Sequence, residues 1–225
     1  MTRRVFMLTT GKIIGFVLTL LLWSWVLNTQ GTPAQSLWII IGGVLAVFPV
    51  VWMGRKLLDM QPTIDRTAWV TTIVHYALMI LFGAAIIKAF QLGQHWQGWV
   101  IPLPTEIGLT LVVVTGAAML LTVVNLALQG LGAPFALVLS QRLAINWLYA
   151  WTRNPMVLAA FAFLIALGLW LRSTLFVVWV IVLVIPAWVV FLKVYEEREL
   201  ELRFGAPYLE YKVNTPMLWP RKPKI

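Results

Sequence analysis

Residues 155–192 read PMVLAAFAFLIALGLWLRSTLFVVWVIVLVIPAWVVFL and carry the clearest structural signal in the chain. A helix that crosses the hydrocarbon core of a bilayer needs about 20 apolar residues, with a range of roughly 17–25. Residues 155–171 and 175–192 both meet this length, and only Arg172, Ser173 and Thr174 join them. Because so short a link makes neighbouring helices antiparallel, the stretch predicts a hairpin of two membrane helices. Pro155 suits a first helical turn, and Pro186 predicts a kink.

Four further apolar segments precede this hairpin, at residues 13–27, 37–53, 69–90 and 107–128. The whole chain is 61% hydrophobic and 11% charged, whereas a soluble domain carries about 25% charged residues. The sequence therefore predicts an all-α, polytopic membrane helical bundle of about six transmembrane helices. Its C-terminal helical hairpin is followed by cytoplasmic C-terminal helices.

The basic residues are distributed unevenly about these spans. Only Lys88 and Arg172 fall on one side of a six-span bundle. The opposite side holds the following residues: Arg3, Arg4, Lys12, Arg55, Lys56, Arg66, Arg142, Arg153, Lys193, Arg198, Arg203, Lys212, Arg221, Lys222 and Lys224. By the positive-inside rule, both termini are then cytoplasmic. The net charge of +9 is thereby attributed to topology, and no nucleic-acid partner is expected.

Few residues suited to metal or nucleophilic chemistry are present. The chain has no cysteine, which excludes disulfides, thiolate metal sites and a cysteine nucleophile. Since His75 and His95 are far apart in sequence, no metal site is expected. His75 lies in the third span, where a neutral, hydrogen-bonded histidine is favoured over a proton carrier. An alternative for the N-terminus is a signal peptide ending near Thr32.

Three polar clusters interrupt the last third of the chain, all on the predicted cytoplasmic side. Gly130 and Gly132 follow the fourth span and either allow close backbone approach to a ligand or simply end a helix. Arg153 and Asn154 precede Pro155. The guanidinium suits a carboxylate, but a topology-setting arginine followed by an ordinary Asn cap explains the pattern equally well.

The third cluster begins with two adjacent carboxylates, Glu196 and Glu197. On a helix they flank the face that bears Leu200 and Phe204, whereas Glu199 and Glu201 are expected to be solvated. A second short helix should carry Tyr208 and Tyr211 on one face. Two inward carboxylates suit a ligand rich in hydroxyls or positive charge; the alternative is a charge-balanced juxtamembrane helix.

Together these clusters resemble the integral-membrane methyltransferase family of isoprenylcysteine carboxyl methyltransferase and phosphatidylethanolamine N-methyltransferase. The block Arg153, Asn154, Pro155, Met156 resembles the family's R-[HN]-P-M-Y block, with Val157 in place of its tyrosine. Glu196 and Glu197 resemble its Glu-Glu block. The tail of the chain is similar to F-G-x-x-Y-x-x-Y-x-x-x-x-P-x-x-x-P and comprises Phe204, Gly205, Tyr208, Tyr211, Pro216 and Pro220.

This resemblance implies a single membrane domain, 1–225, in which 1–129 is scaffold and 130–225 is catalytic. It implies S-adenosylmethionine as methyl donor, and a membrane-embedded lipid or prenylated acceptor such as an isoprenylcysteine carboxylate or a phospholipid amine. It also implies a bacterial inner-membrane location with a cytoplasmic site. The implied donor-binding residues are Gly130, Gly132, Tyr149, Arg153, Asn154, Pro155, Glu196, Glu197, Tyr208 and Tyr211. It names no catalytic acid or base.

Two other functions remain open. One is an NADPH-dependent sterol-type reductase, for which Arg142, Arg198 and Lys212 could bind a 2′-phosphate. The other is a small transporter, which would show facing intramembrane ionisable residues or an inverted repeat. Neither the oligomeric state nor the acceptor follows from these patterns.

Overall fold

The computed structural model describes residues 3–95, 100–132 and 139–223, with side chains from residue 7 onward and without the side chain of His95. The expectations for Arg3, Arg4 and Lys224 therefore lie outside the described side chains. Within the described residues the chain is helical and contains no strand, apart from one isolated bridge between Val100 and Ser173. The all-α architecture is confirmed.

Five helical segments are long and apolar enough to cross a membrane. They are Met7–Asn28, Pro33–Met60, Ile64–Gln94, Thr105–Gly130 and Thr174–Phe204. The remaining predicted span forms α7 (Pro155–Trp170), which has 16 residues and is therefore about 24 Å long, short of the roughly 30 Å hydrocarbon core. The protein is thus an integral membrane bundle, in which five of the six predicted helices have the full spanning length.

The described chain divides into two compact units. Of the described residues, the first unit contains 3–95 and Pro186–Glu199, and the second contains 100–132, 139–185 and 200–223. Two boundaries fall inside helices, one in α9 (Ile185–Val190) and one in α10 (Glu197–Phe204).

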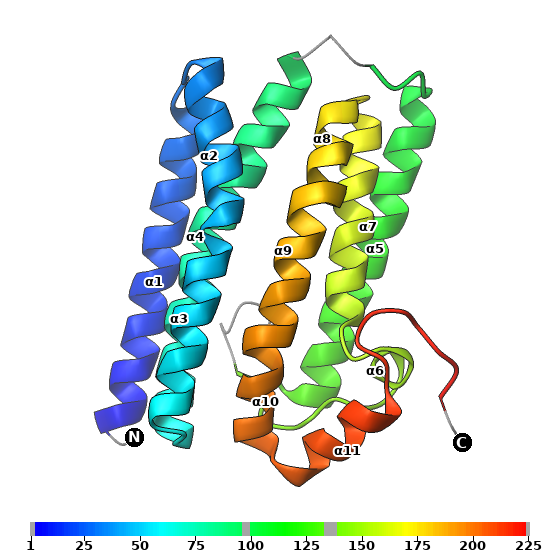
Figure 1. Ribbon diagram of the computed structural model, residues 1–225. Helices are drawn as coiled ribbons and strands as arrows, with labels where there is room; N and C mark the ends of the chain where they lie inside the picture. Colours follow the sequence, from blue (N-terminus) through cyan, green and yellow to red (C-terminus); the bar gives the residue numbers. More distant parts are fainter. Residues whose placement is uncertain (1–2, 96–99, 133–138, 224–225) are drawn as a thin grey trace. The chain divides into compact units, whose positions relative to one another are not determined.

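The first unit is built on α1 (Arg3–Asn28), α2 (Pro33–Leu45), α3 (Val47–Met60) and α4 (Ile64–His95), which run side by side in Figure 1. Small residues let these helices approach closely, as is usual in membranes. A Cβ added to Gly43 would lie 2.6 Å from the carbonyl oxygen of Leu81. The Trp23 indole occupies the space beside Gly83 and donates its Nε1–H to the Met79 carbonyl at 3.1 Å.

The second predicted span is interrupted at Ala46, which separates α2 from α3. Pro49 explains the interruption, because proline lacks an N–H and its ring clashes with the carbonyl four residues earlier, here that of Leu45. The start of α2 is a capping box. The Thr32 hydroxyl accepts from the Gln35 N–H at 3.2 Å, and the Gln35 side chain accepts from the Thr32 N–H at 2.9 Å.

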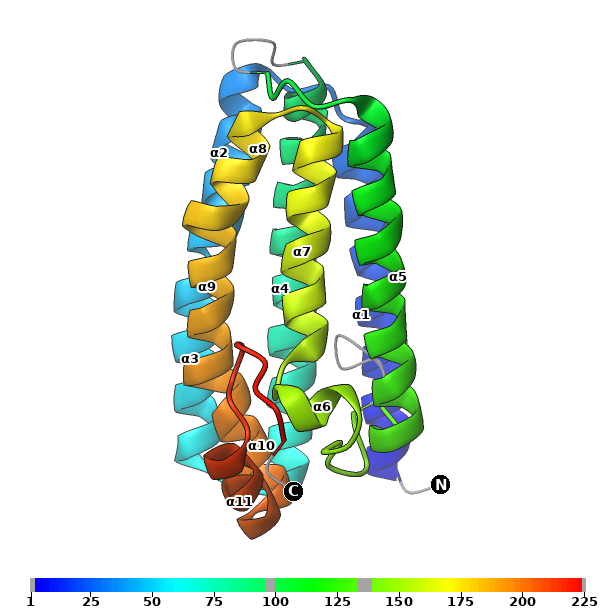
Figure 2. The ribbon, with the colours of Figure 1, turned by 90° about the vertical axis from the view of Figure 1, so that its right-hand side faces the viewer.

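The second unit pairs α5 (Thr105–Gly130) with α7, as Figure 2 shows. A Cβ on Gly108 would lie 2.7 Å from the Cα of Trp170, so this glycine sets the closest approach of the pair. The predicted hairpin is confirmed in the turn from α7 to α8 (Thr174–Trp179). Ser173 caps α8 by accepting the Phe176 N–H at 3.2 Å.

The helix that begins with α8 contains two π-helical turns. It continues as the π-helical turn η2 (Val180–Val184), then α9 (Ile185–Val190), the second π-helical turn η3 (Phe191–Glu196) and α10. In η2 the Ile185 N–H donates to the Val180 carbonyl five residues earlier. This wide turn immediately precedes Pro186, where an α-helical ladder would lack a donor.

Candidate functional site

The loop that carries Arg153 lies between α6 (Leu148–Trp151) and α7. The backbone N–H of Arg153 donates to the Pro216 carbonyl at 2.8 Å. Its Nη1 donates to the Tyr208 hydroxyl at 3.2 Å, and the side chain is half-buried. The guanidinium is therefore held by a tyrosine of the C-terminal helix α11 (Ala206–Asn214), which restricts its direction.

Asn154 adopts a role that the sequence patterns did not predict. Its Nδ2 donates to the Met217 carbonyl at 3.1 Å, and no side-chain hydrogen bond caps α7. Asn154 thus occupies the expected N-cap position of α7 without a capping hydrogen bond from its side chain, and the predicted first-turn position of Pro155 is confirmed. Thr152, which is buried, donates to the same Met217 carbonyl at 3.0 Å. The C-terminal tail thus holds this loop through its backbone, and Figure 2 shows it returning from α11 towards α6.

Tyr208 and Tyr211 lie on one buried face of α11, as predicted. Their ring centroids are 6.4 Å apart. The Tyr211 hydroxyl donates to the carbonyl of Tyr149 at 2.6 Å. Burial, reinforced by the nearby Tyr149, raises the pKa of Tyr211 above its ordinary value, although Arg153 opposes this effect. Tyr211 is therefore a neutral hydrogen-bond donor that fastens α11 to α6.

Gly130 and Gly132 approach another segment of the chain. The Gly130 carbonyl accepts from the N–H groups of Gln141 at 2.8 Å and Arg142 at 3.1 Å. A Cβ on Gly132 would lie 2.4 Å from the Ser140 hydroxyl. Arg203 donates to the Ser140 carbonyl. The close approach that these glycines permit is thus used for packing the 140–142 segment, and their contact with a donor molecule stays a prediction.

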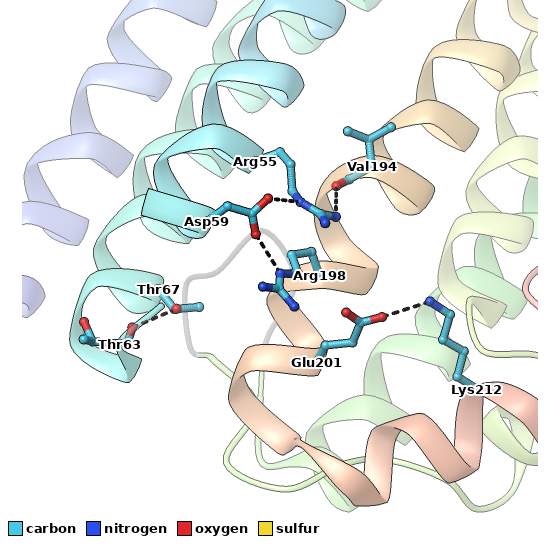
Figure 3. Close-up of polar contacts among 8 residues, drawn as sticks. All are labelled: Arg55, Asp59, Thr63, Thr67, Val194, Arg198, Glu201 and Lys212. Carbon is cyan, nitrogen blue, oxygen red and sulfur yellow. Dashed lines mark hydrogen bonds and ion pairs between the residues drawn. The ribbon is translucent and has the colours of Figure 1, made fainter. Parts of the chain in front are cut away.

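Glu196 and Glu197 lie where η3 passes into α10, in the first unit, and both are half-buried. The expectation that Glu199 is solvated was wrong, because this residue is only 3% exposed. Glu201 pairs with Lys212 at 3.0 Å within the second unit (Figure 3). The helical phase argument failed for Glu199 because it took the face bearing Leu200 and Phe204 as the buried one, whereas these two residues are half-buried and Glu199 is the buried residue of α10.

The structure therefore brings five of the predicted residues together in the second unit. These are Tyr149, Arg153, Asn154, Tyr208 and Tyr211. Glu196 and Glu197 belong to the first unit. No group of three or more His, Asp or Glu side chains that could hold a metal ion occurs among the described residues.

Comparison with known families adds one decisive observation. Residues 104–206 match the model of the phospholipid methyltransferase family. This match, a little under half of the 225 residues, confirms the predicted resemblance to integral-membrane methyltransferases. It indicates transfer of a methyl group to a lipid-type acceptor. No curated protein and no solved structure matched the chain.

The phospholipid methyltransferase match begins at residue 104, before α5 and before the first of the motifs that carried the resemblance. It includes the loop of Arg153 and the Glu196–Glu197 pair, and it ends before Tyr208 and Tyr211.

Proposed function

We propose that this protein transfers a methyl group from S-adenosylmethionine to an amphiphilic acceptor embedded in the membrane. The observation that carries the proposal is the family match over residues 104–206, which contains both the Arg153 block and the Glu196–Glu197 pair. The charges of these residues suit the methyl donor. A guanidinium binds its carboxylate through a planar fork, and carboxylates accept hydrogen bonds from its amine or ribose hydroxyls.

The chemistry asks the protein mainly for alignment. When bound, S-adenosylmethionine supplies a methyl group attached to a sulfonium, and transfer of this methyl group leaves a neutral thioether. Arg153, held by Tyr208 and by the tail, would orient the donor's carboxylate. Glu196 and Glu197 would bind its polar groups. Fixed orientation and exclusion of water account for large parts of such rate enhancements. A carboxylate acceptor needs no base, whereas an amine acceptor must lose a proton.

We place the donor site and both termini on the cytoplasmic side, on the basis of the distribution of basic residues. The chain has no cysteine, so single-cysteine variants can be labelled without background. A cysteine at Val213, which is 82% exposed, should react with a membrane-impermeant maleimide only after membranes are opened. A cysteine at Gln94, at the far end of the third span, should react in intact cells. The reverse pattern would overturn this topology.

The direct test of function is equilibrium binding of S-adenosylhomocysteine to the purified protein, with NADPH as the competing ligand. Arg153→Ala and Glu197→Gln should each weaken binding about ten- to a hundredfold, since hydrogen bonds to charged groups contribute about 1.5–3 kcal/mol. Arg172→Ala, at the opposite end of α7, and Glu210→Gln, on the exposed face of α11, are matched controls. Tight NADPH binding without binding of S-adenosylhomocysteine would refute the proposal.

The acceptor can be sought by incubating membranes with isotopically labelled S-adenosylmethionine and analysing lipids and prenylated compounds by mass spectrometry. Label in a phospholipid amine would assign the headgroup as substrate. Label in a base-labile methyl ester would assign a carboxylate acceptor instead.

A further inference from the structure

The π-helical turn η3 leads directly into the Glu196–Glu197 pair. The Glu197 N–H donates to the Leu192 carbonyl, five residues earlier, instead of to the residue four earlier. A π-turn inserts about one extra residue into a helix, and each residue turns an α-helix by about 100°. The direction in which these carboxylates point relative to the preceding membrane helix therefore depends on this turn.

A buried hydrogen bond ties η3 to α4. The hydroxyls of Thr71 and Tyr195 lie 3.0 Å apart, and the two residues are 1% and 0% exposed. Removing a hydroxyl from water without a partner is costly, so each group stabilises the placement of the other. Tyr195 immediately precedes Glu196, and its position in the turn is thus coupled to α4.

Packing of the Tyr195 ring supports the same placement. Gly54 of α3 leaves room for the ring, since an added Cβ would lie 2.8 Å from Tyr195 Cε2. The ring of Phe191, at the start of η3, stacks on the Tyr195 ring at a centroid distance of 5.8 Å and an interplanar angle of 19°. The turn therefore packs closely against α3 and α4 as well as within itself.

A second set of contacts holds the residues on both sides of the carboxylate pair (Figure 3). Arg55 of α3 donates to the Val194 carbonyl at 3.1 Å and to Asp59 at 2.6 Å. Asp59 also accepts from Arg198 at 2.8 Å. These side chains are 30–42% exposed, so the ion pairs contribute little stability. Their geometric effect is to attach Val194 and Arg198, which flank Glu196 and Glu197, to a single helix.

We propose that α3 and α4 set the π-turn η3, and with it the direction of Glu196 and Glu197, chiefly through the Thr71–Tyr195 hydrogen bond. Thr71 and Tyr195 are positioning residues. The inference rests on the proposed function, in which the carboxylates bind the methyl donor. Gly54, Arg55, Asp59 and Thr71 all lie outside the matched residues 104–206, so the N-terminal helices would contribute to the site as well as to the scaffold.

The test compares variants of the full-length protein in detergent or nanodiscs. Thr71→Val and Tyr195→Phe each remove one hydroxyl while keeping side-chain size. Thr72→Val is the matched control, because Thr72 is also buried but donates to the Ala68 carbonyl within its own helix at 2.8 Å. Thr71→Ser retains the hydroxyl. For each variant, the dissociation constant of S-adenosylhomocysteine and the thermal midpoint are measured.

The expected result is about three- to thirtyfold weaker binding for Thr71→Val and Tyr195→Phe, within the range for residues coupled to a site they do not contact. Thr72→Val and Thr71→Ser should bind like the wild type. The double variant Thr71→Val/Tyr195→Phe should recover thermal stability, because no hydroxyl is left unpaired, yet its binding should remain weak. A purely structural role would restore both properties together.

Three outcomes overturn the inference. Wild-type affinity in both single variants would show that the hydrogen bond does not orient the carboxylates. If Thr72→Val weakens S-adenosylhomocysteine binding to the same extent, the loss of binding reflects lower stability in general. Absence of binding in the wild-type protein itself would refute the proposed function, and the positioning role with it.

Discussion

Replacing Gly54 with alanine tests the packing of α3 against α4 and η3. A Cβ at this position would lie 2.6 Å from Val74 Cγ2 and 2.8 Å from Tyr195 Cε2. Real Cβ contacts essentially never fall below 3.0 Å, and neither neighbour is the free end of a flexible chain. One is a β-branched side chain of α4 and the other is a ring that is fully buried. Both contacts must therefore be relieved, by a shift of α3 away from α4 and by a movement of the Tyr195 ring or of α3 away from it.

The magnitude follows from two opposing effects. Inserting a methyl group into a packed core costs about 1–3 kcal/mol, whereas glycine to alanine inside a helix gains roughly 0.5–1 kcal/mol. Gly42→Ala provides the control, because Gly42 lies in the same membrane span and an added Cβ would meet nothing within 4 Å. Since both variants share the helical gain, their difference isolates the packing cost.

Thermal denaturation in one detergent measures this difference. For a chain of this size, 1 kcal/mol corresponds to about 2–4 °C, so Gly54→Ala should denature roughly 2–12 °C below Gly42→Ala. If Tyr195 yields by rotating away, binding of S-adenosylhomocysteine should weaken as well. Equal midpoints for the two alanine variants would refute the packing described for α3, α4 and η3.

Two further changes each remove the hydrogen-bonding group of one buried side chain. Tyr211→Phe should cost about 1–3 kcal/mol because it leaves the buried Tyr149 carbonyl without its donor. The folded-state pKa of Tyr211 is raised, so its contribution to the free energy of unfolding should be constant below about pH 10 and decline above it, where the hydroxyl ionises in the unfolded chain. A difference in stability between wild type and variant that stays constant through alkaline pH would contradict this. Lys88→Met should lower the thermal midpoint, since Lys88 is 3% exposed and donates to the Thr29 carbonyl beyond α1 at 2.6 Å and to Gln91 at 2.9 Å. The loss should be about 1.5–3 kcal/mol, and an unchanged midpoint would show that this cation does not stabilise the end of α1.

Most of the membrane bundle could be predicted from hydropathy, because a helix in lipid must satisfy its backbone hydrogen bonds internally. The break at Ala46 was missed although Pro49 was visible, since a proline in an apolar run is compatible with an unbroken or a kinked helix. The π-turns were also missed. They depend on which residues pack beside the helix, and hydropathy does not contain that information.

The candidate site was predictable only where it rests on motifs. The blocks at Arg153 and at Glu196 are local in sequence and led to the resemblance that the match over residues 104–206 confirms. Two features were not predictable: the hydrogen bond from the Asn154 side chain to the Met217 carbonyl and the burial of Glu199. Both depend on residues or surfaces that the folded chain brings in from elsewhere.

The sequence by itself determined that this is a helical membrane protein with a methyltransferase-like region, because apolar length and short motifs are properties of consecutive residues. Only the tertiary structure decided how Arg153 is held by Tyr208 and the C-terminal tail, and how Tyr195 is tied to Thr71. These contacts join residues 55 to 124 positions apart, and a hydrogen bond of that range is specified by packing and burial.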